Sequence, residues 1–179
     1  MDDQSKQTTE ILDSAFTALS GVTYTRADML RRIRILRQYF EYRYFLGHTD
    51  ADFASFAQSV QLGEYDTQAL VSLGENFYAP FTREKAYPLL DALLERAKTA
   101  AGIHLYLPFV PDDRELLTLG QWMRKNAGVT ALLDLRCDGS LVGGFAMVKG
   151  DKYMDFTVRY FLDKQRSSIT TILDKYADA

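Results

Sequence analysis

Apolar residues in the first hundred positions recur every three or four residues, the spacing that places them on one face of an α-helix. The clearest stripe follows Thr25, which can cap a helix that has Asp28 in its first turn. Several such segments with short connections predict a helical bundle over residues 1–101. Helices are expected at 9–19, from Thr25 to Gly47, after Asp50, from an Asp66 cap to Pro80, and after Thr82 with Pro88 opening the main helix.

The pattern changes at Gly102, where short runs rich in strand-forming residues replace the helical spacing. Asp138-Gly139 is placed to form a hairpin turn between two strands, and Gly150-Asp151 marks a second turn. Residues 102–179 therefore predict a small α+β domain with a short β-meander after the all-α bundle, so that the fold class is α+β. Strands are expected at 103–107, 129–137, 141–148 and 152–155, with helices at 112–128 and from Thr157 onward.

Composition narrows the class of protein. Hydrophobic residues make up 47% and charged residues 25% of the 179 positions, as in folded soluble proteins, and the net charge of −3 gives no general attraction to nucleic acid. The acidic opening is unlike a secretory signal, and no apolar run approaches the roughly 18 residues that cross a bilayer. A single cysteine excludes an internal disulfide. These features predict a cytoplasmic protein that meets a membrane only through a partner.

The candidates for chemistry favour structural roles. His48 and His104 are too far apart in sequence to form a motif, and one cysteine cannot complete a zinc site with them. Cys137 is interpreted as a buried small apolar residue on a strand. The pair Gly143-Gly144 lacks the spacing of a phosphate loop, and it predicts a bulge or the close approach of another backbone. We therefore expect no catalytic, metal or cofactor site.

The helix after Thr25 is rich in arginine. Its six arginines stand against Asp28 and Glu41. A basic helix could contact phosphates, but at 100° per residue the arginines spread around the polar arc, which favours a solvated face or a face that meets an acidic partner helix. Arg26, Arg34 and Arg37 cluster, whereas Arg31, Arg32 and Arg43 scatter around that arc. The possible partner-binding residues are Arg31, Arg34, Arg37 and Tyr39.

One stretch resembles a known family. The run from Cys137 to Phe145, followed by a Gly-Asp turn and an aspartate before the last helix, is similar to the C-terminal signature of the ATP synthase delta subunit. The mitochondrial counterpart of that family is the oligomycin-sensitivity-conferring protein. The similarity covers about residues 103–165, although Phe156 and Thr157 stand where the family has Gly and Ser. The motif residues are Asp138, Ser140, Leu141, Gly143, Gly144, Phe145, Gly150 and Asp155.

The resemblance implies a non-catalytic stator subunit in the peripheral stalk of a rotary proton-translocating ATP synthase, without a cofactor. Residues 1–101 would bind the N-terminal segments of the alpha subunits, and residues 102–179 would bind the C-terminal ends of the membrane-anchored b subunits. The chain would then lie peripherally on the cytoplasmic side of the membrane, without inserting into it and without binding nucleic acid. Two alternatives stay open: a nucleic-acid-binding helical module that uses the arginine-rich helix, and a small enzyme with a pocket of perturbed acids.

Overall fold

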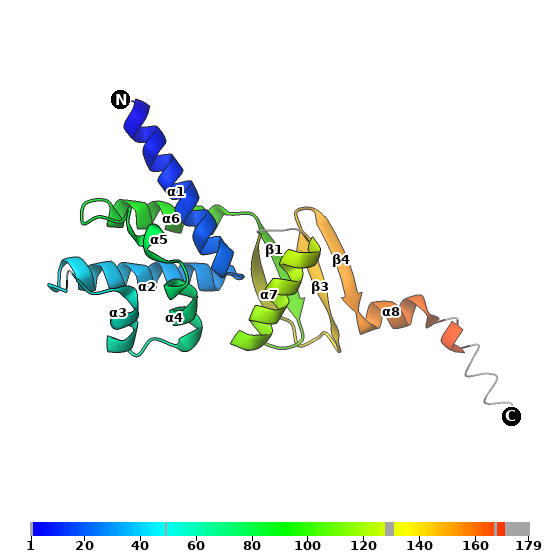
Figure 1. Cartoon of the computed structure of the whole chain (residues 1–179). Helices are drawn as coiled ribbons and strands as arrows, with labels where there is room; N and C mark the ends of the chain where they lie inside the picture. The colour runs from blue at the N-terminus through cyan, green and yellow to red at the C-terminus, as the bar shows by residue number, and fades with distance from the viewer. Residues whose placement is uncertain (1, 49, 128–130, 167, 171–179) are drawn as a thin grey trace. The chain divides into compact units, whose positions relative to one another are not determined.

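The computed structural model describes residues 2–48, 50–127, 131–166 and 168–170 (Figure 1). The chain divides into two compact units, which are described separately below. The N-terminal unit comprises Met1–Ala101 and Asp113–Leu132, and the sheet unit comprises Gly102–Asp112 and Leu133–Ala179. Helices dominate the first unit and a four-stranded sheet forms the second, which confirms the predicted α+β class.

Local capping signals set where the helices of the N-terminal unit begin. The Thr25 hydroxyl accepts a hydrogen bond from the backbone N–H of Asp28 at 3.0 Å, as predicted, and Asp52 caps the next helix through the N–H of Ser55 at 2.8 Å. The first helix is longer than the predicted 9–19, because polar residues extend it back to Asp2. The helices are α1 (Asp2–Val22), α2 (Arg26–Tyr44), α3 (Phe53–Ser59), α4 (Glu64–Val71), α5 (Glu75–Tyr78), α6 (Ala86–Thr99) and α7 (Asp113–Ala127).

Aromatic rings fill much of the core of this unit. Phe40 of α2 is fully buried and stacks on Phe81 with ring centroids 5.0 Å apart. Tyr39 meets the edge of Phe53 at 5.3 Å, and Phe53 stacks on Tyr78 at 5.9 Å. Each such ring pair adds about 0.5–1.5 kcal/mol beyond the burial of its area. The rings therefore join α2, α3, α5 and the connection before α6 into one core.

Two predicted features of the helical bundle are corrected by the structure. Asp66 does not cap the fourth helix, because α4 begins two residues earlier, after Gly63, and the Asp66 carboxylate turns toward α2. The run from Asp66 to Pro80 is not one helix, since Gly74 at φ 71° separates α4 from the single turn of α5. Pro88 lies in the first turn of α6, where its missing N–H breaks no helical hydrogen bond, close to its predicted place.

Helix α7 belongs to the N-terminal unit although strands precede and follow it in the chain. Arg124 donates to the backbone carbonyl of Thr23 at 2.6 Å, and its guanidinium lies 4.2 Å from the centre of the Tyr24 ring. A Cβ on Gly120 would come within 2.1 Å of the Tyr24 ring, so only glycine fits there. Arg124 also donates to the carbonyls of Ser20 and Gly21, which have no helical partner at the end of α1.

The sheet unit is built from β1 (Gly102–Leu107), β2 (Leu132–Cys137), β3 (Gly144–Lys149), β4 (Lys152–Thr157) and α8 (Val158–Lys164), with strand order β2-β1-β3-β4. β3 is antiparallel to both β1 and β4, with Leu105 opposite Met147 and Met147 opposite Met154. The predicted turn at Gly150-Asp151 is confirmed as the hairpin between β3 and β4.

The predicted hairpin at Asp138-Gly139 is wrong. β1 lies between β2 and β3, so these two runs are not neighbours in the sheet. Alternate residues of β1 are buried, which shows that one face of the sheet is covered there. The N–H of Asp138 donates to the carbonyl of Leu107 at the end of β1, 2.8 Å away. Residues 138–143 therefore cross from one side of β1 to the other.

Candidate docking surfaces

The first part of the motif is a self-contained turn after β2. One carboxylate oxygen of Asp138 accepts hydrogen bonds from the backbone N–H of Ser140 at 2.9 Å and from its hydroxyl at 2.6 Å. These bonds from Ser140 hold the pKa of the Asp138 carboxyl below its ordinary value. The N–H of Leu141 donates to the Asp138 carbonyl at 3.1 Å. The motif residues Asp138 and Ser140 thus shape the backbone.

The glycine pair joins the start of β3 to the end of β4. Gly144 has φ +78°, and a Cβ there would lie 2.2 Å from the carbonyl oxygen of Phe156 and 2.9 Å from the Cα of Thr157. The carbonyl of Gly143 accepts a hydrogen bond from the N–H of Val158 at 3.0 Å. The predicted close approach of another backbone is therefore confirmed, and it rules out any larger side chain at Gly144 without movement of β4.

The end of the motif directs the chain into α8. Asp155 accepts from the N–H of Thr157 at 2.9 Å, and Thr157 caps α8 by accepting from the N–H of Tyr160 at 3.2 Å. Phe145 stacks on Phe156 with ring centroids 4.9 Å apart. The structure thus brings Gly143, Gly144, Phe145 and Asp155 to the junction of β3, β4 and α8, while Asp138 and Ser140 form their own turn and Gly150 lies in the β3–β4 hairpin.

Helix α8 leaves large apolar side chains in solvent. None of the side chains of Val158–Lys164 is buried, and Phe161 is 51% exposed. Val158, Phe161 and Leu162 are spaced i, i+3 and i+4, so they share one face of the helix, which we call the α8 face. Val142, beside Gly143, is 88% exposed. Basic residues outnumber acidic ones around this face, with Arg159, Lys164 and Arg166 against Asp163. An exposed apolar helix face with a basic border is typical of a protein interface.

The N-terminal unit has a groove along α1, which we call the α1 groove. It encloses about 450 Å³ between one face of α1 and residues 73–80. Its floor is apolar, with Ala15 and Phe77 buried, and small residues of α1 keep it open. The spacing of Ser14, Ala15 and Ala18 was visible in the sequence, but nothing there showed that residues 73–80 lie opposite. The lining residues are Gln7, Glu10, Ile11, Ser14, Ala15, Ala18, Leu73, Asn76, Phe77 and Pro80.

The four proposed partner-binding residues do not form one surface. Arg31 donates to both oxygens of Asp66 at 2.7 and 3.0 Å and pairs with Asp28 at 2.7 Å. Arg37 pairs with Asp91 of α6. Tyr39 is only 2% exposed, and its hydroxyl donates to the Ala51 carbonyl at 3.1 Å. Arg34 lies in solvent, where it donates to its own helix at the Leu30 carbonyl.

Arg32 does not lie on the predicted polar arc of α2, because its side chain is fully buried. It donates to Asp66 at 3.0 Å and to the Val22 carbonyl at 2.7 Å, which ties α2 to α4 and to the end of α1. Burial acts to raise the pKa of Asp66, but hydrogen bonds from Arg31 and Arg32 outweigh it and hold that pKa below its ordinary value. The Asp66 hydrogen bonds also raise the pKa of Arg31. This cluster is structural.

The remaining candidates for chemistry stay apart. Cys137 is exposed at the end of β2 and is not the predicted buried residue, because burial along this strand falls from Leu132 to its last residues. His48 stacks on Tyr42 with ring centroids 4.0 Å apart, and Nδ1 of His104 lies 3.6 Å from Asp134. Within the described residues, no three His, Cys, Asp or Glu side chains come together as metal ligands could.

Comparison with known proteins agrees with the motif. No family model matches the chain. It is 30% identical over 79 residues to ATP synthase subunit delta of Verminephrobacter eiseniae (strain EF01-2), covering 44% of this chain and 43% of that protein. It is 28% identical over 109 residues to the protein of the same name in Acidovorax sp. (strain JS42), covering 57% of this chain and 61% of that protein.

The chain resembles ATP synthase subunit delta. The resemblance inferred from the motif is thereby confirmed by two curated relatives. The chain spans about half the length of the curated relatives it matches. In the part of the chain that the structure describes, no helix combines the length and the apolar character needed to cross a membrane.

Proposed function

We propose that this chain is a non-catalytic stator subunit of a rotary proton-translocating ATP synthase. The similarity to two delta subunits carries the proposal. The geometry supports it, because the chain offers an apolar groove in one unit and an exposed apolar helix face in the other. Such surfaces suit the docking of partner helices and need no catalytic group.

In this proposal the N-terminal unit binds the N-terminal segments of the alpha subunits in the α1 groove. The groove has an apolar floor and a polar border that includes Gln7 and Glu10. An amphipathic helix could lay its apolar residues on Ala15 and Phe77 while its polar face stays in water. The aromatic core beneath would keep the two walls of the groove at a fixed separation.

The sheet unit would bind the C-terminal ends of the b subunits through the α8 face. Val158, Phe161 and Leu162 supply the apolar contact, and Arg159, Lys164 and Arg166 supply a border that favours carboxylates on the partner. The motif residues serve this surface indirectly, since Gly143, Gly144 and Asp155 fix the direction in which α8 leaves the sheet. We infer a peripheral location on the cytoplasmic side of the membrane, held there by the b subunits.

A stator must hold the catalytic head still against the torque of the central rotor. The ion pairs and ring contacts of the N-terminal unit and the close packing at Gly144 are suited to carry load without chemistry. The arginines of α2 support this reading over the nucleic-acid alternative. Arg32 is buried, and Arg31 and Arg37 are engaged with carboxylates within the chain, so little of the helix is available to phosphates.

Affinity purification of the tagged full chain from native membranes tests the proposal. Recovery of alpha, beta and b subunits together is the expected result. Recovery of nucleic acid without these subunits, lost steeply as salt is raised, would overturn the proposal in favour of the nucleic-acid module.

Two variants test which surface binds which partner subunit. Phe161→Ser with Leu162→Ser is expected to lose b subunits and keep alpha, because it removes apolar contacts of the α8 face only. Ser14→Trp is expected to do the reverse, because the indole would fill the α1 groove from an exposed position. Arg34→Glu is a control on α2, since this exposed side chain donates to the Leu30 carbonyl of its own helix. Loss of all partners in every variant would point to misfolding and would be checked by circular dichroism.

A further inference from the structure

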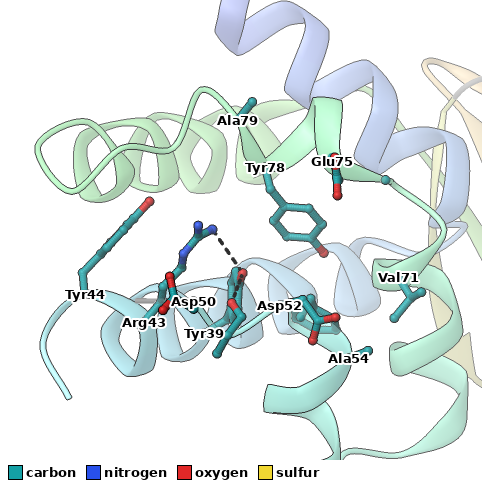
Figure 2. A pocket seen from close by; sticks show the side chains of 13 residues that line it. Tyr39, Arg43, Tyr44, Asp50, Asp52, Ala54, Val71, Glu75, Tyr78 and Ala79 are labelled. Atoms are coloured by element: carbon teal, nitrogen blue, oxygen red, sulfur yellow. Dashed lines mark hydrogen bonds between the residues drawn. The ribbon is translucent and has the colours of Figure 1, made fainter. Parts of the chain in front are cut away.

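A second hollow in the N-terminal unit is not explained by the α1 groove. It encloses about 520 Å³ between the C-terminal half of α2, residues 50–54, and residues 71–79 (Figure 2). We call it the α2–α5 pocket. The single turn of α5 separates it from the α1 groove, because Asn76 and Phe77 line the groove while Glu75 and Tyr78 line the pocket. A pocket of this volume lies in the range that binds ligands or partner side chains.

One wall of the α2–α5 pocket is aromatic. Tyr39, Tyr44, Phe53 and Tyr78 line it, and Phe53 and Tyr78 stack on each other with ring centroids 5.9 Å apart. The hydroxyls of Tyr39 and Tyr78 are engaged with backbone carbonyls, at 3.1 and 2.8 Å. Tyr39 and Phe53 are buried behind this wall, so the ring surface open to the pocket belongs to Tyr44 and Tyr78, which are partly exposed. Ring faces attract cations through their quadrupole.

Carboxylates dominate the charge of the pocket. Asp50, Asp52 and Glu75 stand against the single guanidinium of Arg43, which gives a formal charge of −3 + 1 = −2. Hydrogen bonds from Ser55 lower the pKa of Asp52, so this carboxyl stays ionised at neutral pH. In the view of Figure 2, Arg43 and Tyr44 lie to the left of Tyr78, whereas Asp52 lies below its ring. An incoming cation would therefore meet negative charge beside a ring.

The N-terminal unit itself shows that guanidinium groups sit well on such rings. Arg43 lies 5.6 Å from the centre of the Tyr44 ring, within the pocket wall. Elsewhere in the unit, Arg32 lies 4.7 Å from the centre of the Tyr65 ring and pairs with Asp66. A ring plus a carboxylate is thus the environment that this fold already gives to an arginine.

We propose that the α2–α5 pocket receives an arginine side chain from a basic segment of a protein partner. The charge of the pocket and its rings select the guanidinium. The small apolar residues Ala51, Ala54, Val71 and Ala79 line the rest of the pocket and leave room for the residues on either side of that arginine. The volume exceeds that of one side chain, which favours a polypeptide over a small free cation. This surface goes beyond the stator proposal and does not depend on it.

Fluorescence anisotropy with the full chain tests the proposal. The probe is a short labelled peptide of Gly and Ser that contains two arginines, and the matched peptide carries glutamates in their place. We expect the arginine peptide alone to bind, and amide shifts in NMR spectra to concentrate at Ala51, Ala54, Gly74 and Ala79. Asp50→Asn with Glu75→Gln should weaken binding roughly five- to tenfold, the loss expected for two partly exposed ion pairs. Asp52 is left intact because it caps α3.

A charge-matched control separates the pocket from general attraction. Glu41→Gln with Glu84→Gln removes the same two charges from exposed positions outside the pocket, and it should change the affinity by less than about twofold. Val71→Trp should abolish binding by filling the pocket without altering charge.

Three results would overturn the proposal: equal weakening by both double variants, no binding of the arginine peptide, or binding of spermidine as tight as that of the peptide. The last result would identify a site for small polycations.

Discussion

The two units of this molecule differ in how completely they cover their own apolar residues. In the N-terminal unit, large side chains such as Phe40, Phe81 and Leu90 are fully buried. In the sheet unit, Ile103, Leu105 and Ala146 are buried in the sheet, but none of the side chains of α8 is. The first unit therefore has a closed aromatic core, although Phe45, Leu46 and Trp122 on its surface are more than half exposed. The second unit presents a helix whose apolar face still needs a covering surface.

The two units also differ in how far apart in sequence the partners of their charged groups lie. The N-terminal unit buries charge and satisfies it over long sequence separations, as when Arg32 of α2 meets Asp66 of α4. In the sheet unit, the two motif carboxylates are satisfied locally, since Asp138 accepts hydrogen bonds from Ser140 and Asp155 accepts one from the N–H of Thr157. Removing a polar group should therefore destabilise the whole first unit, but in the second it should disturb one turn.

The largest effect is expected from Asp66→Ala. The substitution leaves Arg32 charged, fully buried and without its carboxylate, which costs about 3–5 kcal/mol of unfolding free energy. Urea denaturation followed by circular dichroism measures it. Asp91→Ala, which removes the exposed partner of Arg37, is the matched control and should cost less than about 1 kcal/mol. Similar losses for both variants would contradict the distinction between buried and exposed pairs.

Gly144→Val should have the next largest effect, confined to the sheet unit. The new Cβ would meet the Phe156 carbonyl at 2.2 Å, and a β-branched residue is strained at φ +78°. The combined cost is about 2–4 kcal/mol. Hydrogen exchange should rise in β3 and β4 and stay unchanged in α2.

Gly139→Val serves as the control for that variant, because a Cβ at this glycine meets nothing within 4 Å. If both glycine variants left exchange in β3 and β4 unaltered, the close approach at Gly144 would not stabilise the sheet.

The features that could be predicted from the sequence are those set by near neighbours. The Thr25 cap, the strand at 103–107 and the turn at Gly150 each depend on a few adjacent residues. The Gly143-Gly144 pair indicated a close approach of backbone, but not that β4 makes it. The position of β1 between β2 and β3 could not be read in this way, because it depends on pairing between runs that are distant in the chain. The α1 groove and the α2–α5 pocket could not be predicted for the same reason, because each forms only where residues 71–80 lie opposite a distant helix.

Arg32 shows why periodicity misjudges a charged residue. At 100° per residue it falls on the polar arc of α2, where a solvated side chain is the usual outcome. The structure buries it because Asp66, 34 positions later, supplies a carboxylate, and because the Val22 carbonyl at the end of α1 lacks a helical partner. Neither partner of Arg32 can be inferred from the sequence of α2 alone.

A smaller loss of unfolding free energy is expected at acid pH. The pKa of Asp66 is held below its ordinary value, so its ion pairs contribute full stability to the N-terminal unit above the unfolded pKa of about 3.9. That stability is lost as the pH falls through the lower pKa of the folded state. Chemical denaturation at a series of pH values from neutral to acid should show the loss beginning below about pH 4. Asp66→Asn should flatten this dependence in the same range, and an unchanged profile in that variant would assign the titration to another group.

The smallest change in stability is expected from variants of the α8 face, which should change partner binding the most. Phe161→Ser with Leu162→Ser alters side chains that are already half in solvent, so the unfolding free energy of the free chain should move by no more than about 0.5 kcal/mol. Leu105→Ala, in the buried strand of the same unit, should cost about 2–5 kcal/mol. A partner that covers the α8 face would reverse this order in a binding assay, because the exposed residues would carry the contact and Leu105 would only support it. If the double serine variant instead unfolds the sheet unit, the α8 face is part of a core and not a docking surface.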